Sequence, residues 1–161
     1  LSLLKILDNQ PSAALDHLDY AQKIFDTLSV DVKTPQRSLE LALLRARAYA
    51  LSKRPAMALE LLESLGAKPQ VHRLMVDVAW SAGFWDDAAA ELAEVMIDEE
   101  ISLTRPLTSQ QAQIILNRAV ALNLDSDRIA LANMREKYSD AMAQTDKAKL
   151  FDVVTRPRQL V

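Results

Sequence analysis

The two histidines are the first residues of this 161-residue chain that could do chemistry. His17 and His72 could ligate a metal or act as a general base, but neither has a partner residue at a spacing typical of a metal site or a catalytic triad. The chain has no cysteine, which excludes disulfides and thiolate metal sites. We expect both histidines to occupy ordinary packing or rim positions, and we predict no metal.

Acidic residues are the second candidates, because carboxylates bind cations. They gather at Asp98, Glu99 and Glu100, and again at Asp125 and Asp127. The first group lacks the glycine-containing pattern of a calcium loop, so a solvated loop is expected. The second group suits helix caps, in which a carboxylate accepts a backbone N–H.

The two glycines, Gly66 and Gly83, stand apart in the sequence. A phosphate-binding loop needs glycines close together, so a nucleotide site is not expected. No nucleophile has an identifiable base at a suitable spacing. The sequence therefore predicts no catalytic residue and no cofactor, and we expect a protein that is not an enzyme.

The composition favours an all-α fold. Half of the residues are apolar but only 5% are aromatic, and two glycines are very few for a fold with many tight turns. The net charge of -3 argues against a dedicated polyanion binder, so no nucleic acid is expected as the main partner. No apolar run approaches the ~18 to 20 residues of a membrane span, so we expect no membrane insertion.

The start of the chain leaves its cellular location open. Leu3, Leu4, Ile6 and Leu7 have helical spacing, as in the second half of a helix cut from a longer protein. An anchor or targeting signal could then lie upstream. A soluble fragment in either the cytoplasm or the periplasm fits a chain without cysteine.

Apolar residues recur at intervals of three and four through most of the chain, which is the period of an α-helix. Thr34-Pro35, Pro55 and Thr108 with Gln111 are start signals, whereas Gly66 and Gly83 are stop signals. The last helices use Ile129, Ala130, Met134, Tyr138 and Met142, and then Thr145 as the cap of a short helix with Phe151. The predicted helices cover about 12–28, 36–53, 55–65, 70–82, 85–96, 108–122, 127–142 and 145–154, with a longer connection at 98–107.

A short pattern of proline, alanine and leucine occurs twice. It runs over Pro11-x-x-Ala14-Leu15-x-x-Leu18 and returns with the same spacing over Pro55-x-x-Ala58-Leu59-x-x-Leu62. A reduced form follows at Ala88-x-x-x-Leu92 and Ala130-x-x-x-Met134. Such repetition is typical of stacked helix pairs, each of which buries its apolar face against the next.

The chain resembles the tetratricopeptide repeat (TPR) family. Ala46-x-x-Tyr49, Ala58-x-x-x-Leu62 and Pro69 carry the resemblance, followed by Gly83-x-Trp85-x-x-Ala88-x-x-x-Leu92. It implies a right-handed α-α superhelix, a TPR-like solenoid, of about four degenerate helix pairs over 1-155, with a flexible tail at 156-161. The stretch 151–157 is similar to the end of large bacterial proteins of this type with unassigned roles, which implies a scaffold function.

In the register of that family, Arg47, Arg73, Asp77 and Trp80 face the concave side. Arginine and tryptophan are enriched at binding hot spots, so these four residues are the candidate partner-binding site. The peptide-carboxylate clamp of the family is not reproduced, because Leu43 and Arg47 occupy its positions, then Arg73 and Asp77. In the alternative interpretation Trp80 packs against the next helix and the arginines are solvated.

The expected function is a non-catalytic protein-protein interaction or scaffold module that binds a partner segment in a concave helical groove. The first alternative is a helical regulatory domain that contacts DNA, for which 36–54 has several basic residues, spread around the helix. A hydrolase, a purely structural piece that stacks on missing repeats, and a homo-oligomer are the others.

Overall fold

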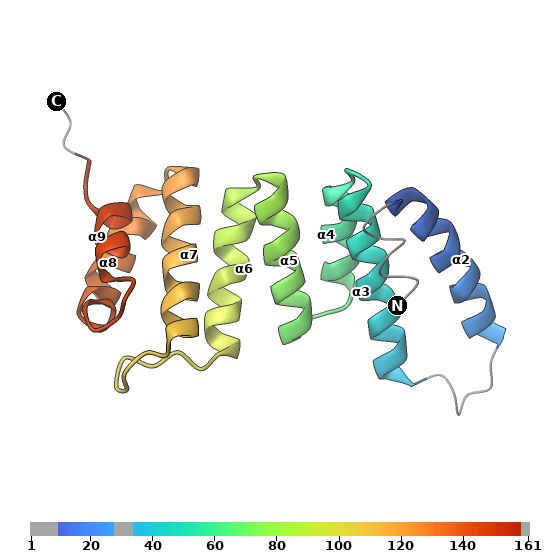
Figure 1. The fold of residues 1–161 in the computed structure, drawn as a ribbon, viewed down its shortest axis with the longest axis horizontal. Coiled ribbons are helices and arrows are strands. Elements are labelled where there is room, and N and C mark those ends of the chain that lie inside the picture. Colours follow the sequence, from blue (N-terminus) through green and yellow to red (C-terminus); the bar gives the residue numbers. More distant parts are fainter. Residues whose placement is uncertain (1–9, 28–33, 159–161) are drawn as a thin grey trace. The chain divides into compact units, whose positions relative to one another are not determined.

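The computed structural model describes residues 10–27 and 34–158, which form eight α-helices and no strand (Figure 1). The all-α prediction is confirmed. The helix expected near Leu3 and the loop expected at 29–33 lie outside the described residues, as does the end of the predicted tail. The helices are α2 (Pro11–Thr27), α3 (Pro35–Leu51), α4 (Pro55–Ser64), α5 (Pro69–Ala82), α6 (Trp85–Asp98), α7 (Ser109–Asp125), α8 (Arg128–Ala143) and α9 (Ala148–Thr155).

The chain divides into two compact units, Leu1–Val78 and Ala79–Val161. We call them unit 1 and unit 2. Helix α5 runs across the division, so its residues up to Val78 belong to unit 1 and the remainder to unit 2.

In unit 1, α3 packs against both α2 and α4 (Figure 1). Ala14, Leu18 and Ala48 form a fully buried cluster at the contact of α2 with α3. The small alanine side chains let the helix axes approach closely, so that the neighbouring leucines interlock.

The ends of these helices follow the start and stop signals of the sequence. The Thr34 side chain accepts a hydrogen bond from the Arg37 backbone N–H, and Pro35 begins α3. Gly66 and Gly83 adopt positive φ angles of 76° and 74° beyond α4 and α5, where an L side chain would be strained. The caps and stops predicted at these positions are confirmed.

In unit 2, α7 packs against α6, α8 and α9, and α8 also packs against α9. Phe151, Ile115 and Met142 are among its largest fully buried side chains. Arg135 of α8 reaches α9, where it donates hydrogen bonds to the Asp152 backbone oxygen and to Thr155 Oγ1, both at 3.1 Å. An apolar core and one arginine therefore hold α9 in place.

Helix α7 begins with the capping box that its sequence predicts. Thr108 Oγ1 accepts from the Gln111 backbone N–H, and Gln111 Oε1 accepts from the Thr108 backbone N–H, both at 3.1 Å. Gln111 Nε2 also donates to the backbone oxygen of Glu99, the residue after α6. One side chain thus joins the end of α6 to the start of α7.

Three predictions in the last helices are wrong in detail. Ile129, expected on the inner face of α8, is 77% exposed, and Leu131 is buried in its place with Met134 and Tyr138. The reason is that Asp127 caps α8 by accepting from the Ala130 backbone N–H, which turns Ile129 outward in the first turn.

Asp125 is the last residue of α7 and not a cap of the next helix. Thr145 also lies farther from its helix than expected: α9 begins at Ala148, and Lys147 is the residue before it. The Thr145 hydroxyl accepts from the Lys147 backbone N–H and so shapes the turn that leads into α9.

Candidate binding groove

A groove of about 500 Å³ lies between α3 and α5 in unit 1. We call it the α3/α5 groove. Its apolar lining consists of three leucines, and its polar lining contains two acidic, two basic and one amide side chain. The lining residues are Leu43, Leu44, Leu74, Glu40, Asp77, Arg47, Arg73 and Gln70.

The two helices present their lining residues with identical spacing. On α3 these are residues 40, 43, 44 and 47, and on α5 they are residues 70, 73, 74 and 77. Each set follows the i, i+3, i+4, i+7 pattern, which places four side chains on one helix face over two turns. The groove therefore follows directly from two matched helix faces.

The leucines form the deepest part of the groove. Leu74 is 6% exposed, whereas Leu43 and Leu44 are half-buried. Arg47, on the rim, is exposed. An apolar side chain seated on the leucines would thus be surrounded by charged groups.

The charges of the rim influence one another. Partial shielding from water raises the pKa of Asp77, and the positive charge of Arg47 offsets part of that rise. Glu40 and Asp77 balance the two arginines, so the lining has no net charge at neutral pH. Such a groove can attract both ends of a charge-alternating segment.

Three of the four predicted site residues meet in this groove. Arg47, Arg73 and Asp77 all line it. Trp80 does not: it belongs to unit 2, where its half-buried ring meets the ring of Trp85 edge-on, with the centroids 5.3 Å apart and the planes at 88°. Trp80 therefore packs against the first residue of α6.

Several lining residues were missed by sequence reasoning. Glu40, Leu44, Gln70 and Leu74 belong to the groove as much as the arginines do. Their signal was present, because a repeat of the i, i+3, i+4, i+7 set at matching positions of two first helices marks a shared face. Alanine and aromatic spacing alone does not reveal it.

A second groove, of about 450 Å³, lies in unit 2 between α6, α7 and α8. Its cations already have partners within the protein. Arg118 donates to the Ala89 backbone oxygen at 3.2 Å, and Lys137 Nζ lies 5.3 Å from the centre of the Tyr138 ring. We therefore regard the α3/α5 groove as the better binding surface.

The histidines and carboxylates form no candidate centre in the described part of the chain. His17 is exposed and His72 is buried in α5. Among residues 10–27 and 34–158, no three His, Asp or Glu side chains lie together as metal ligands would. The same residues contain no helix with the length and apolar character needed to cross a membrane.

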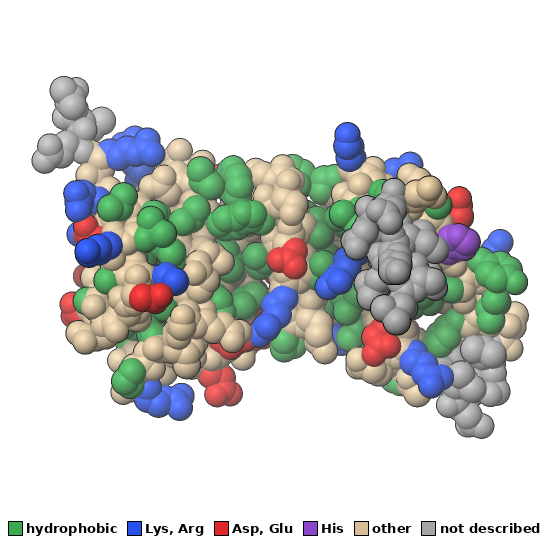
Figure 2. Space-filling view, in the orientation of Figure 1, with side chains coloured by type: hydrophobic (Ala, Val, Ile, Leu, Met, Phe, Trp, Pro, Cys, Tyr) green, Lys and Arg blue, Asp and Glu red, His purple; other side chains and the backbone are tan. Residues whose placement is uncertain are grey.

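Acidic and basic side chains are interspersed on the face of the molecule that Figure 2 presents. A surface that binds nucleic acid gathers its cations into a patch or stripe. This face offers no such patch.

Comparison of the chain with known protein families, with curated proteins and with solved structures gives no match.

Proposed function

We propose that this chain is a non-catalytic protein-protein interaction module whose α3/α5 groove receives an extended or helical segment of a partner protein. The observation that carries the proposal is the pair of matched helix faces, each with the i, i+3, i+4, i+7 pattern, on the two sides of one open groove.

The TPR-like architecture is part of the proposal. Antiparallel neighbours such as α3 with α4, and α7 with α8, are joined by short turns and pack as pairs. Buried alanines at Ala46 and Ala58 occupy the positions that permit close helix crossing. A right-handed superhelix of about four such pairs would place the first helices α3 and α5 on its concave side.

The groove recognises its partner through its lining. An apolar residue of the partner would rest on Leu74 and the half-buried leucines of α3. Charged residues on either side of it would pair with Arg47 and Asp77. Because the helices already hold this lining in place, little ordering is needed on the protein side when the segment binds.

The proposal is tested by selection of binders from a random peptide library on the full chain. We expect enrichment of segments with one apolar residue between an acidic and a basic residue. The double variant Arg47→Ala with Arg73→Ala should weaken the selected peptides roughly tenfold or more, since arginines at a groove rim act as hot spots. Trp80 is left unchanged, because loss of its contact with Trp85 would disturb folding.

The matched control removes two positive charges from unit 1 outside the groove. Lys23→Ala with Arg54→Ala changes exposed residues that do not line it. Circular dichroism should show unchanged helix content in both double variants. Equal peptide affinity for the groove variant and the control would overturn the proposal.

A further inference from the structure

A separate pocket in unit 2 has a lining with positive charge and no carboxylate. It has a volume of about 160 Å³ and lies between the end of α7, the start of α8 and the segment after α9. We call it the arginine pocket. Its lining residues are Leu122, Asn123, Ser126, Arg128, Leu131, Ala132, Thr155, Arg156, Pro157 and Arg158.

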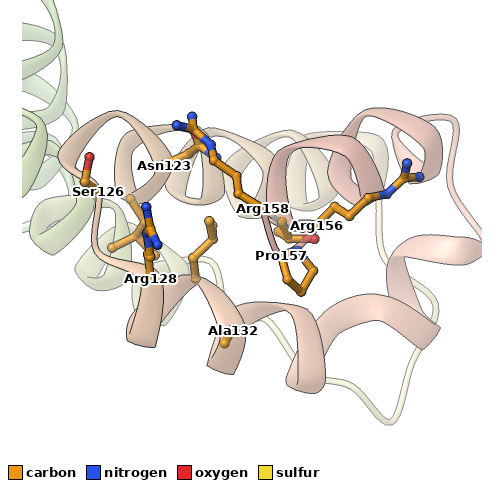
Figure 3. A pocket seen from close by; sticks show the side chains of 10 residues that line it. Asn123, Ser126, Arg128, Ala132, Arg156, Pro157 and Arg158 are labelled. Atoms are coloured by element: carbon orange, nitrogen blue, oxygen red, sulfur yellow. The ribbon is translucent and has the colours of Figure 1, made fainter. Parts of the chain in front are cut away.

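The three arginines of this pocket differ in their partners. Arg156 forms an ion pair with Asp152, and its side chain points away from the pocket in Figure 3. Arg128 has no ion pair with any described residue. Arg158 has only a 3.5 Å contact with Asn123 Oδ1, at the limit of a hydrogen bond.

Both of these arginines reach toward the end of α7 (Figure 3). Arg128 comes from the first residue of α8 and Arg158 from the segment after α9. Asn123 Nδ2 donates to the Val154 backbone oxygen at 2.8 Å, which ties that segment to α7. Two guanidinium groups from different elements are thus available to one ligand.

The nearby carboxylates do not neutralise these charges. Asp127 accepts from the Ala130 backbone N–H as the cap of α8, and Asp152 is engaged by Arg135 and Arg156. Asp125 is exposed at the end of α7 and does not line the pocket. An oxyanion with apolar atoms attached could therefore bind the guanidinium groups through charge-assisted hydrogen bonds.

The size and floor of the pocket define the ligand further. One water occupies about 30 Å³ in the liquid, so the pocket has room for a group of roughly five waters and not for a nucleotide. Leu122, Leu131 and Pro157 provide apolar surface below the arginines.

We propose that the arginine pocket binds a small organic oxyanion, with the negative head group between Arg128 and Arg158 and a short apolar part on the leucines. This site is independent of the α3/α5 groove and of the function proposed for it. The head group is a carboxylate or a phosphate monoester, and the experiment separates the two.

The test is a titration of the full chain, followed by ¹H–¹⁵N NMR at constant ionic strength, with butyrate, butyl phosphate, inorganic phosphate and chloride. We expect saturable shifts at the amides of Ser126 and Arg128 with butyrate or butyl phosphate, whichever has the matching head group. Butyl phosphate should bind more tightly than inorganic phosphate if the apolar floor contributes. Equal affinity of these two, or shifts that do not saturate, would overturn the proposal.

Variants locate the site. Arg128→Gln and Arg158→Gln should each weaken binding roughly tenfold, the usual loss for a hydrogen bond between charged groups. Arg105→Gln is the control, because Arg105 precedes α7 and thus lies at its opposite end, about 25 Å away along 17 residues. All three residues are exposed, so their loss leaves the core intact. Unchanged affinity in the first two variants, or an equal loss in the third, would contradict the assignment.

Discussion

The α3/α5 groove and the arginine pocket use charge in opposite ways. The groove sets two acidic and two basic side chains around a leucine stripe, whereas the lining of the pocket contains three arginines and no carboxylate. A balanced rim suits a polypeptide segment, which carries both signs along its length. A lining of one sign suits a small ligand with the opposite charge.

Two aspartates show the same contrast at the level of single groups. Shielding raises the pKa of Asp77 in the groove, with the charge of Arg47 opposing it. Hydrogen bonds from Arg156 and Arg135 lower the pKa of Asp152 beside the pocket. Ionisation of Asp77 therefore opposes folding, and ionisation of Asp152 favours it.

The largest expected effect tests whether the core of unit 2 supports the pocket. Phe151 of α9 is 2% exposed, and Phe151→Ala should lower the free energy of unfolding by about 3–5 kcal/mol. Loss of the α9 anchor should also abolish butyl phosphate or butyrate binding. Both tryptophans of the chain, Trp80 and Trp85, lie in unit 2, so urea denaturation followed by tryptophan fluorescence reports on this unit.

Val153→Ala is the matched control on the same helix. Val153 is 63% exposed, and its truncation should change the free energy of unfolding by less than about 0.5 kcal/mol. Similar losses for the two variants would mean that α9 is not anchored by Phe151.

An intermediate effect is expected for Asp152→Asn, which removes the ion pairs with Arg135 and Arg156. The folded protein holds the Asp152 carboxylate with a pKa below its ordinary value of 3.8, so its stabilisation is present at neutral pH. It is lost as the pH falls below 3.8 and through the lowered pKa. Urea denaturation across this pH range should show a less stable variant at pH 7 and equal stabilities at the acidic end.

A double-mutant cycle with Arg135→Gln provides the control for this prediction. If Arg135 and Asp152 interact, the two substitutions together should cost less than the sum of their separate effects. Strict additivity at neutral pH would remove the ion pair as the cause.

The smallest effect is expected for Asp77→Asn, and its sign is reversed. The raised pKa of Asp77 means that stability falls as the pH rises above 3.8 and through the raised value. The neutral amide removes that cost, so at pH 7 the variant should be equally stable or more stable, by less than about 1 kcal/mol because the groove is open to solvent. A clear loss of stability in thermal denaturation at pH 7 would show that the attraction of Arg47 outweighs the shielding.

Much of the fold could be predicted from local signals. Thr34-Pro35, Gly66, Gly83 and the Thr108 capping box act within one helical turn, and each lies where it was expected. Ile129 was misplaced for a related reason. The cap at Asp127 fixes where α8 begins, and a shift of that start by one residue rotates every side chain about the helix by 100°.

The site could be predicted only in part, because grooves depend on pairs of helices. Arg47, Arg73 and Asp77 were found through the repeat register, and they share one lining. Trp80 was assigned to the same face, although its position one turn after Asp77 brings it to Trp85. The arginine pocket was missed entirely, since Asn123, Arg128 and Arg158 come together through the packing of three elements that no sequence period links.

The side chain of Gln111 has a consequence for protein engineering. It fastens the start of α7 to the residue after α6, so the ten residues at 99–108 are not needed to set the spacing of the two helices. Longer loops raise the entropic cost of closure only slowly. The exposed stretch at 103–106 is thus a natural place to graft a tag or a second recognition loop while both helices keep their alignment.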